Sequence, residues 1–236
     1  MSQLMLQNSK LPQYTMTLPV SKILTTFRPF VVKEEKILLM ALQSKNLNQI
    51  NDAMRNVIVA CTNGVLDTQK LCSADAEYAF LQIRCKSVGE EVKPQVTCTK
   101  CQQTTNIKIK LDEVTVNQQK KEILDPNIKI TDDTTIVLRY PSIHDIDYNK
   151  DEVEVAFELA KKCIESVIVG DQVHQAKDID PKEISQFVDN MLPDQFAEII
   201  TFLQSVPELH YEFKYKCPSC KETVKVELKS VSDFFQ

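Results

Sequence analysis

Residues 96–101 read VTCTKC and residues 215–220 read YKCPSC, so two C-x2-C motifs stand far apart in the chain. Each motif lies between two short segments in which apolar and polar residues alternate. Alternation with a period of two on both sides of a tight turn is typical of a β-hairpin. A hairpin tip of this kind presents two thiolates on one side, and two tips together supply the four thiolates of a structural zinc site. The sequence therefore predicts that both hairpins meet at one zinc ion, with these ligands: Cys98, Cys101, Cys217 and Cys220.

The matched spacing and the matched flanks favour a shared zinc site over two unrelated pairs of reduced surface thiols. Four protein thiolates leave no open coordination position, so the zinc is expected to be structural and not catalytic. Lysines surround both motifs, at positions Lys100, Lys108, Lys216 and Lys221. They offset the charge of a zinc tetrathiolate or, alternatively, indicate phosphate binding. Few aromatic residues stand among them to stack on bases, which favours charge balance.

The composition narrows the possible functions. The chain has 236 residues, of which 43% are hydrophobic and 26% charged, as is typical of a soluble globular protein. Its three glycines, Gly64, Gly89 and Gly170, are isolated, so neither a dinucleotide-binding loop nor a Walker loop can be built from them. The net charge of −5 argues against broad nonspecific binding to nucleic acid.

The cysteines and histidines indicate a reducing compartment and no catalysis. Residues 1–10 lack the pattern of a secretion signal, and the apolar run at 37–42 is too short to cross a bilayer. Eight cysteines without a signal favour a cytoplasmic protein, in which C-x2-C pairs bind metal more often than they form disulfides. The other four cysteines are expected to pack in the core: Cys61, Cys72, Cys85 and Cys163. The histidines have no metal or triad spacing, and no nucleophile–base arrangement is visible, so we predict that the protein is not an enzyme.

A weak internal duplication sets the expected organisation. The segment FRPF at 27–30 follows one strand-like stretch, and LRYP at 138–141 follows another. Helices follow in each case, and each half then reaches its own C-x2-C hairpin. We predict an α+β fold of two related, mostly helical units joined by a zinc-ribbon-like site of four cysteines. Residues 1–116 form the first unit, 117–133 a polar linker and 134–236 the second unit, and the two units can pack as a single domain.

Local signals place some helices and turns. Apolar residues at helical spacing predict one helix over residues 152–169. Asp180 followed by Pro181 is typical of a helix start, and Leu192-Pro193 is expected to separate that helix from the next. Arg28 stands between a strand and the pair Glu34-Glu35, so an ion pair is expected to fix the turn between strand and helix.

Residues 14–21 (YTMTLPVS) and 27–41 (FRPFVVKEEKILLMA) resemble the baseplate hub protein family of T-even-type contractile-tailed bacteriophages. The specific part is the strand followed by RPF-x-VKEEK-x-LL, and the later hairpins and the overall length are also similar. The resemblance implies a structural component or assembly factor of the tail baseplate hub, without catalytic activity. It implies other hub proteins as partners, with the tape-measure protein as a further candidate. The protein would be in the host cytoplasm during assembly, and in the virion tail if it is retained.

The net charge and the expected ligand set disfavour two other functions. The first is a zinc-ribbon regulator that binds nucleic acid, which should carry a basic face. The net acidic charge disfavours it. The second is a zinc hydrolase, which needs an open ligand position and a general base, and the sequence offers neither.

Overall fold

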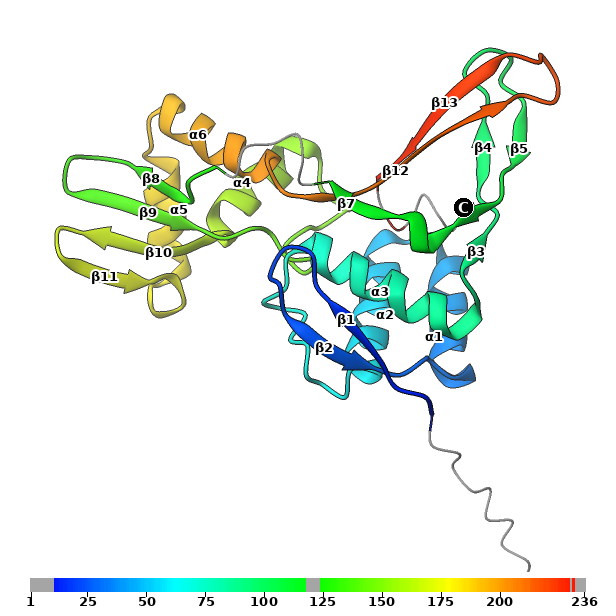
Figure 1. Cartoon of the computed structure of the whole chain (residues 1–236). Helices are drawn as coiled ribbons and strands as arrows, with labels where there is room; N and C mark the ends of the chain where they lie inside the picture. The colour runs from blue at the N-terminus through cyan, green and yellow to red at the C-terminus, as the bar shows by residue number, and fades with distance from the viewer. Residues whose placement is uncertain (1–10, 118–123, 230, 232–236) are drawn as a thin grey trace, which may run out of the picture.

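Helices and short antiparallel strands alternate along the chain in this computed structural model, which describes residues 11–117, 124–229 and 231 (Figure 1). The first half contains β1 (Tyr14–Thr17), β2 (Leu24–Phe27), α1 (Val32–Ser44), α2 (Leu47–Cys61), α3 (Ser73–Val88), β3 (Glu91–Val92), β4 (Gln95–Thr97), β5 (Thr104–Asn106), β6 (Ile109–Lys110), the 3-10 turn η1 (Leu111–Glu113) and β7 (Thr115–Asn117). The second half contains β8 (Asn127–Lys129), β9 (Thr134–Leu138), α4 (Glu152–Lys162), β10 (Ile164–Val169), β11 (Gln172–Gln175), the 3-10 turn η2 (Ala176–Asp178), α5 (Pro181–Asp189), α6 (Pro193–Gln204), β12 (Glu208–Lys216) and β13 (Thr223–Leu228).

The prediction of two mostly helical units is wrong. The described residues form a mixed α/β fold with six α-helices and several antiparallel sheets. The helix predicted over residues 152–169 ends at Lys162, and the rest of that segment is strand β10. Ile164 and Ser166 of β10 are buried and Glu165 between them is exposed, and the strand pairs with β9 on one side and β11 on the other. Its β-branched residues fit a pleated sheet better than a continued helix, and the sheet contacts decide the conformation.

Two hydrophobic cores hold the molecule together. The first lies among β1, β2, α2 and α3, and it also contains Leu209 of β12 and Leu228 of β13. The second lies between the four-stranded sheet β11-β10-β9-β8 and the helices α4 and α6, around Ile136, Ala160 and Phe202. The chain returns from the second core to the first, because β12 also pairs with β7. How the chain divides into domains therefore stays a prediction, and residues 118–123 of the expected linker lie outside the described residues.

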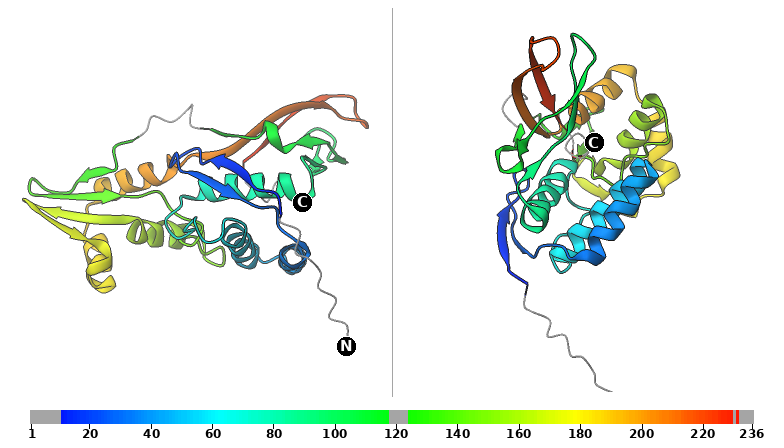
Figure 2. Two further views of the ribbon diagram at one scale, coloured as in Figure 1. Left: turned by 60° about the horizontal axis from the view of Figure 1, so that its bottom comes forward. Right: turned by 90° about the vertical axis from the view of Figure 1, so that its right-hand side faces the viewer.

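The molecule has three parts, which we call the body, the lobe and the arm. The body contains β1, β2 and α1–α3. The lobe, residues 124–204, contains β8–β11 and α4–α6. The arm, residues 93–108 and 213–226, contains the hairpin β4–β5 and the outer part of the hairpin β12–β13. The lobe and the arm lie at opposite ends of the molecule (Figures 1 and 2).

Several local predictions are confirmed. The Asp180 side chain caps α5 by accepting a hydrogen bond from the Lys182 amide, with Pro181 in the first turn. Helix α5 ends before Leu192, and α6 begins at Pro193. Arg28 forms the expected ion pair with Glu34, at 3.0 Å. The Glu34 carboxylate also accepts a hydrogen bond from the Val31 amide, so it ties β2 to the start of α1.

The same contacts recur in the second half. The Arg28 amide donates to the Cys61 carbonyl at the end of α2, and the Arg139 amide donates to the Cys163 carbonyl at the end of α4. Arg139 pairs with Asp145, also six residues ahead, through two hydrogen bonds of 2.7 and 3.2 Å. These recurring contacts favour the tandem-duplication hypothesis, which remains a prediction.

The Arg139–Asp145 pair should make stability depend on pH. Burial raises the pKa of Asp145, but hydrogen bonds from Arg139 and Ser142 outweigh burial and hold it below its ordinary value. A carboxyl with a lowered folded-state pKa stabilises the protein above its unfolded pKa of about 4, and this stability is lost as the pH falls through the folded pKa. We expect Asp145→Asn to lower the free energy of unfolding at pH 7 by about 1–3 kcal/mol. Urea unfolding at pH 7 and pH 3 should show a smaller acid-induced loss in the variant, and equal losses would contradict this account.

Candidate metal centre

The two C-x2-C motifs adopt the same turn. In the first, the Cys98 amide donates to the Gln103 carbonyl at 2.9 Å and the Gln102 amide donates back to the Cys98 carbonyl. In the second, the Cys217 amide donates to the Glu222 carbonyl at 2.9 Å and the Lys221 amide donates back to the Cys217 carbonyl. The residue after each second cysteine is left-handed, with φ of 60° at Gln102 and 64° at Lys221. Both turns therefore hold their cysteine pairs in the same local geometry.

The structure brings the four predicted cysteines together at the outer end of the arm. Cys98 Sγ lies 3.8 Å from Cys220 Sγ, and Cys101 Sγ lies 3.7 Å from Cys217 Sγ. All four sulfur atoms lie within 4.8 Å of one another. A tetrahedral ion with Zn–S bonds of about 2.3 Å separates its sulfurs by about 3.8 Å. The four thiols thus fit a zinc ion, and each short distance joins one hairpin to the other.

The surroundings of the cluster favour the thiolate form at two of the four cysteines. Backbone amides of Cys220 and Ser219 lower the pKa of Cys217 to about 7 despite some desolvation, and the amides of Cys101 and Lys100 similarly lower the pKa of Cys98. Cys220 differs, because burial and the neighbouring thiols outweigh the Glu222 amide and raise its pKa. Such a crowded set of thiols loses all its protons when a cation binds, because metal ligation deprotonates the coordinating sulfur.

A small apolar layer supports the cluster. Cys98 and Cys217 are completely buried with Val96, Tyr215 and Val224. The buried hydroxyl oxygen of Tyr215 has no hydrogen-bond partner among the described residues. Burial raises the pKa of Tyr215, and the negative charge that the four thiols can carry raises it further.

A second cluster of metal-ligating side chains escaped the sequence analysis. His210, Glu212 and Glu227 bring their ligand atoms within 4.8 Å of one another on β12 and β13. Strand periodicity is the sequence signal that could have revealed this cluster. His210 and Glu212 are two residues apart, so they share one face of β12, and Glu227 of β13 pairs with Glu212. Lys225 pairs with Glu212 at 2.8 Å, and Lys229 pairs with Glu227 at 3.6 Å. This exposed group is therefore already balanced in charge.

The other cysteines lie outside the cluster. Cys61, Cys85 and Cys163 are buried in the hydrophobic cores, which confirms their predicted packing role. Burial raises the pKa of Cys61 to about 11, so this thiol is poorly suited to nucleophilic chemistry. Cys72 is partly exposed and precedes the first turn of α3.

None of the helices in the described residues is both long and apolar enough to serve as a membrane span.

Comparison with known proteins identifies the family of the chain. No curated protein and no solved structure matches the chain. A family model described as T4 bacteriophage base plate protein matches residues 11–236, which include the whole body, lobe and arm. The chain therefore belongs to the T4 bacteriophage base plate protein family.

Proposed function

We propose that this chain is a non-enzymatic structural component or assembly factor of the baseplate hub, and that it contains one structural zinc ion. The zinc would be held by four thiolates: Cys98, Cys101, Cys217 and Cys220. The observation that carries the proposal is the closeness of these thiols across two hairpins, in a chain of a baseplate family. A complete set of four protein ligands supplies stability and leaves no position for a substrate.

The proposed partners are other hub and baseplate proteins, with the tape-measure protein as a further candidate. Family membership supports partners in the baseplate. We propose that the protein meets them in the host cytoplasm during assembly and is found in the virion tail if it is retained.

Mass spectrometry of purified phage particles tests this role. A structural subunit is expected in the particles at a fixed ratio to known baseplate proteins. An assembly factor is expected in baseplate precursors but not in finished particles. Absence from both precursors and particles would contradict the proposal.

The lysines of the arm fit the nucleic-acid alternative, but the aromatic side chains beside them do not. Three aromatic side chains of β12 are buried or half-buried and pack against one another, with ring centroids 5.6 Å apart for Tyr211 and Phe213 and 6.3 Å apart for Phe213 and Tyr215. They therefore do not form an open stacking platform for bases. A gel-shift titration with a mixed-sequence oligonucleotide is expected to show no tight binding at physiological salt. Tight binding there would favour the regulator.

A further inference from the structure

Charge is strongly segregated between the two ends of this acidic chain. The arm, residues 93–108 and 213–226, contains seven lysines and one glutamate, a net charge of +6. The lobe, residues 124–204, contains seventeen acidic and seven basic residues, a net charge of −10. The rest of the chain is nearly neutral, because the whole carries −5. Even with the charge of −2 that a zinc tetrathiolate carries, the arm stays positive.

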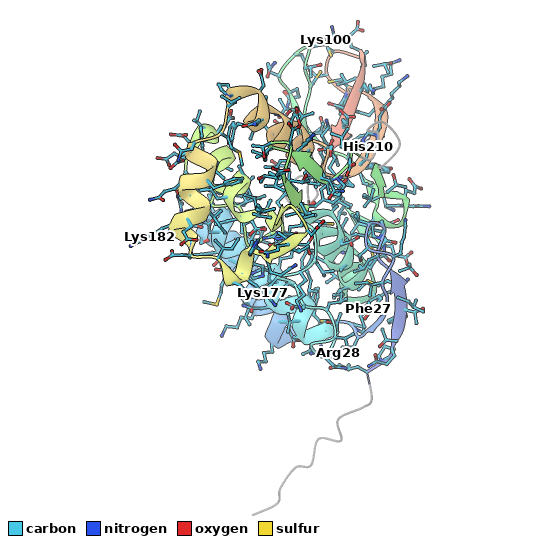
Figure 3. The ribbon with its side chains drawn as sticks, turned by 90° about the vertical axis from the view of Figure 1, so that its left-hand side faces the viewer. Phe27, Arg28, Lys100, Lys177, Lys182 and His210 are labelled. Carbon is cyan, nitrogen blue, oxygen red and sulfur yellow. The ribbon has the colours of Figure 1, made fainter. Side chains whose placement is uncertain are left out.

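The two charged parts cannot neutralise each other within one molecule. The arm projects from one end of the body, and the lobe lies at the other end (Figures 1 and 2). Lys100 is at the outer tip of the arm, far from Lys177 and Lys182 on the lobe (Figure 3). Opposite charges at opposite ends are complementary between copies of the same chain.

The lysines of the arm are available for a partner. Lys108 pairs with Glu91 and Lys225 pairs with Glu212. The other five lysines of the arm are exposed and form no salt bridge within the described part of the chain: Lys93, Lys100, Lys214, Lys216 and Lys221. On the lobe, the exposed glutamates without a salt bridge in the same part of the chain include Glu165 of β10, Glu183 of α5 and Glu198 of α6.

We propose that the arm of one copy docks on the lobe of the next copy, so that the chains associate head to tail. Complementary charge steers such an encounter and fixes its orientation. Because the two docking surfaces differ, the contact is heterologous and each copy can bind one neighbour at either end. Repeated contacts of this kind close into a ring or extend as a filament.

Light scattering with the full chain tests the proposal through its salt dependence. At about 50 mM salt we expect a concentration-dependent mass at least about twofold above the 27.0 kDa monomer. At about 1 M salt, where the screening length falls to about 3 Å, we expect the monomer mass. A wild-type protein that stays monomeric at low salt and high concentration would overturn the proposal.

Two charge-reversal variants locate the surfaces. The arm variant combines Lys100→Glu, Lys216→Glu and Lys221→Glu, and the lobe variant combines Glu165→Lys, Glu183→Lys and Glu198→Lys. Each variant alone is expected to associate at least about tenfold more weakly, since it lacks one surface. Mixed in equal amounts, the two should form dimers that grow no further, through the intact lobe of one and the intact arm of the other. A mixture that stays monomeric would refute the head-to-tail contact.

A matched control separates location from net charge. The variant Lys33→Glu, Lys36→Glu and Lys45→Glu has the same net charge as the arm variant but changes α1 and its C-cap. It should associate as the wild type does, and loss of association in this control would contradict the assigned surface. Zinc content and circular dichroism of each variant show whether a lost contact reflects a lost fold.

Discussion

We expect that replacing Cys98 and Cys217 by serine eliminates the proposed zinc ion and detaches the two hairpins of the arm from each other. Together the two substitutions remove one thiolate from each hairpin, so neither half of the site keeps its cysteine pair. Beyond the thiols, the arm has only a small buried layer, formed by Val96, Tyr215 and Val224. Strands β4 and β5 have three residues each, and an isolated hairpin is at best marginally stable in water. Zinc binding contributes about 10–16 kcal/mol in small zinc domains, so we expect the arm to lose its ordered structure.

Metal analysis and hydrogen exchange measure this effect. The wild type should contain one zinc ion per chain and the variant none. Amide protection in β4, β5 and the outer part of β12–β13 should fall by at least about 100-fold, while protection in α2 and α3 stays high. Cys72→Ser is the matched control, because Cys72 is a partly exposed cysteine outside the cluster. Unchanged zinc content in the double variant would refute the site.

Replacing Asp75 by alanine will destabilise the body by about 2–4 kcal/mol. Asp75 lies in the first turn of α3 and is fully buried. Its two carboxylate oxygens accept hydrogen bonds of 2.8 Å from the amides of Val20 and Ser21, in the turn between β1 and β2. Alanine leaves both amides without this acceptor and removes a negative charge from a helix N-terminus, where the dipole favours it.

Urea unfolding at pH 7 gives the size of this loss. Asp75→Asn is the matched control, because it keeps the shape and one acceptor oxygen but no charge. We expect the free energy of unfolding of Asp75→Asn to lie between that of the wild type and that of Asp75→Ala. A loss below about 1 kcal/mol for Asp75→Ala would show that water replaces the carboxylate at these amides.

The metal-ligand candidates could be predicted from the sequence because their signal is local. The C-x2-C spacing and the alternating flanks occur at Cys98 and again at Cys217, and they predict the same hairpin turn at both places. The Arg28–Glu34 pair was predictable for the same reason, since the partners are six residues apart. Asp75 was not, because the amides that it binds lie 54 and 55 residues away and the sequence does not mark them.

The wrong fold class has a physical cause in the segment after Cys163. Ile164, Val167 and Ile168 suit one face of a helix, while the run of three β-branched residues at 167–169 equally suits a strand. Periodicity alone does not separate these two cases in a short apolar segment. The choice depends on β9 and β11, which lie on either side of β10 and supply its hydrogen bonds. The identity of these neighbours is tertiary information.

The arm joins residues that are 116 and 122 positions apart, which has a consequence for the order of folding. Each turn closes through local contacts, but the two tips meet only after a very long loop has closed, and long loops are entropically costly. The first core, which also gathers Leu209 and Leu228, and the β7–β12 pairing shorten that search by bringing both hairpins to one side of the body. We therefore expect closure of the arm to be a late folding step. A closed arm reports that both halves of the chain have already reached their native arrangement.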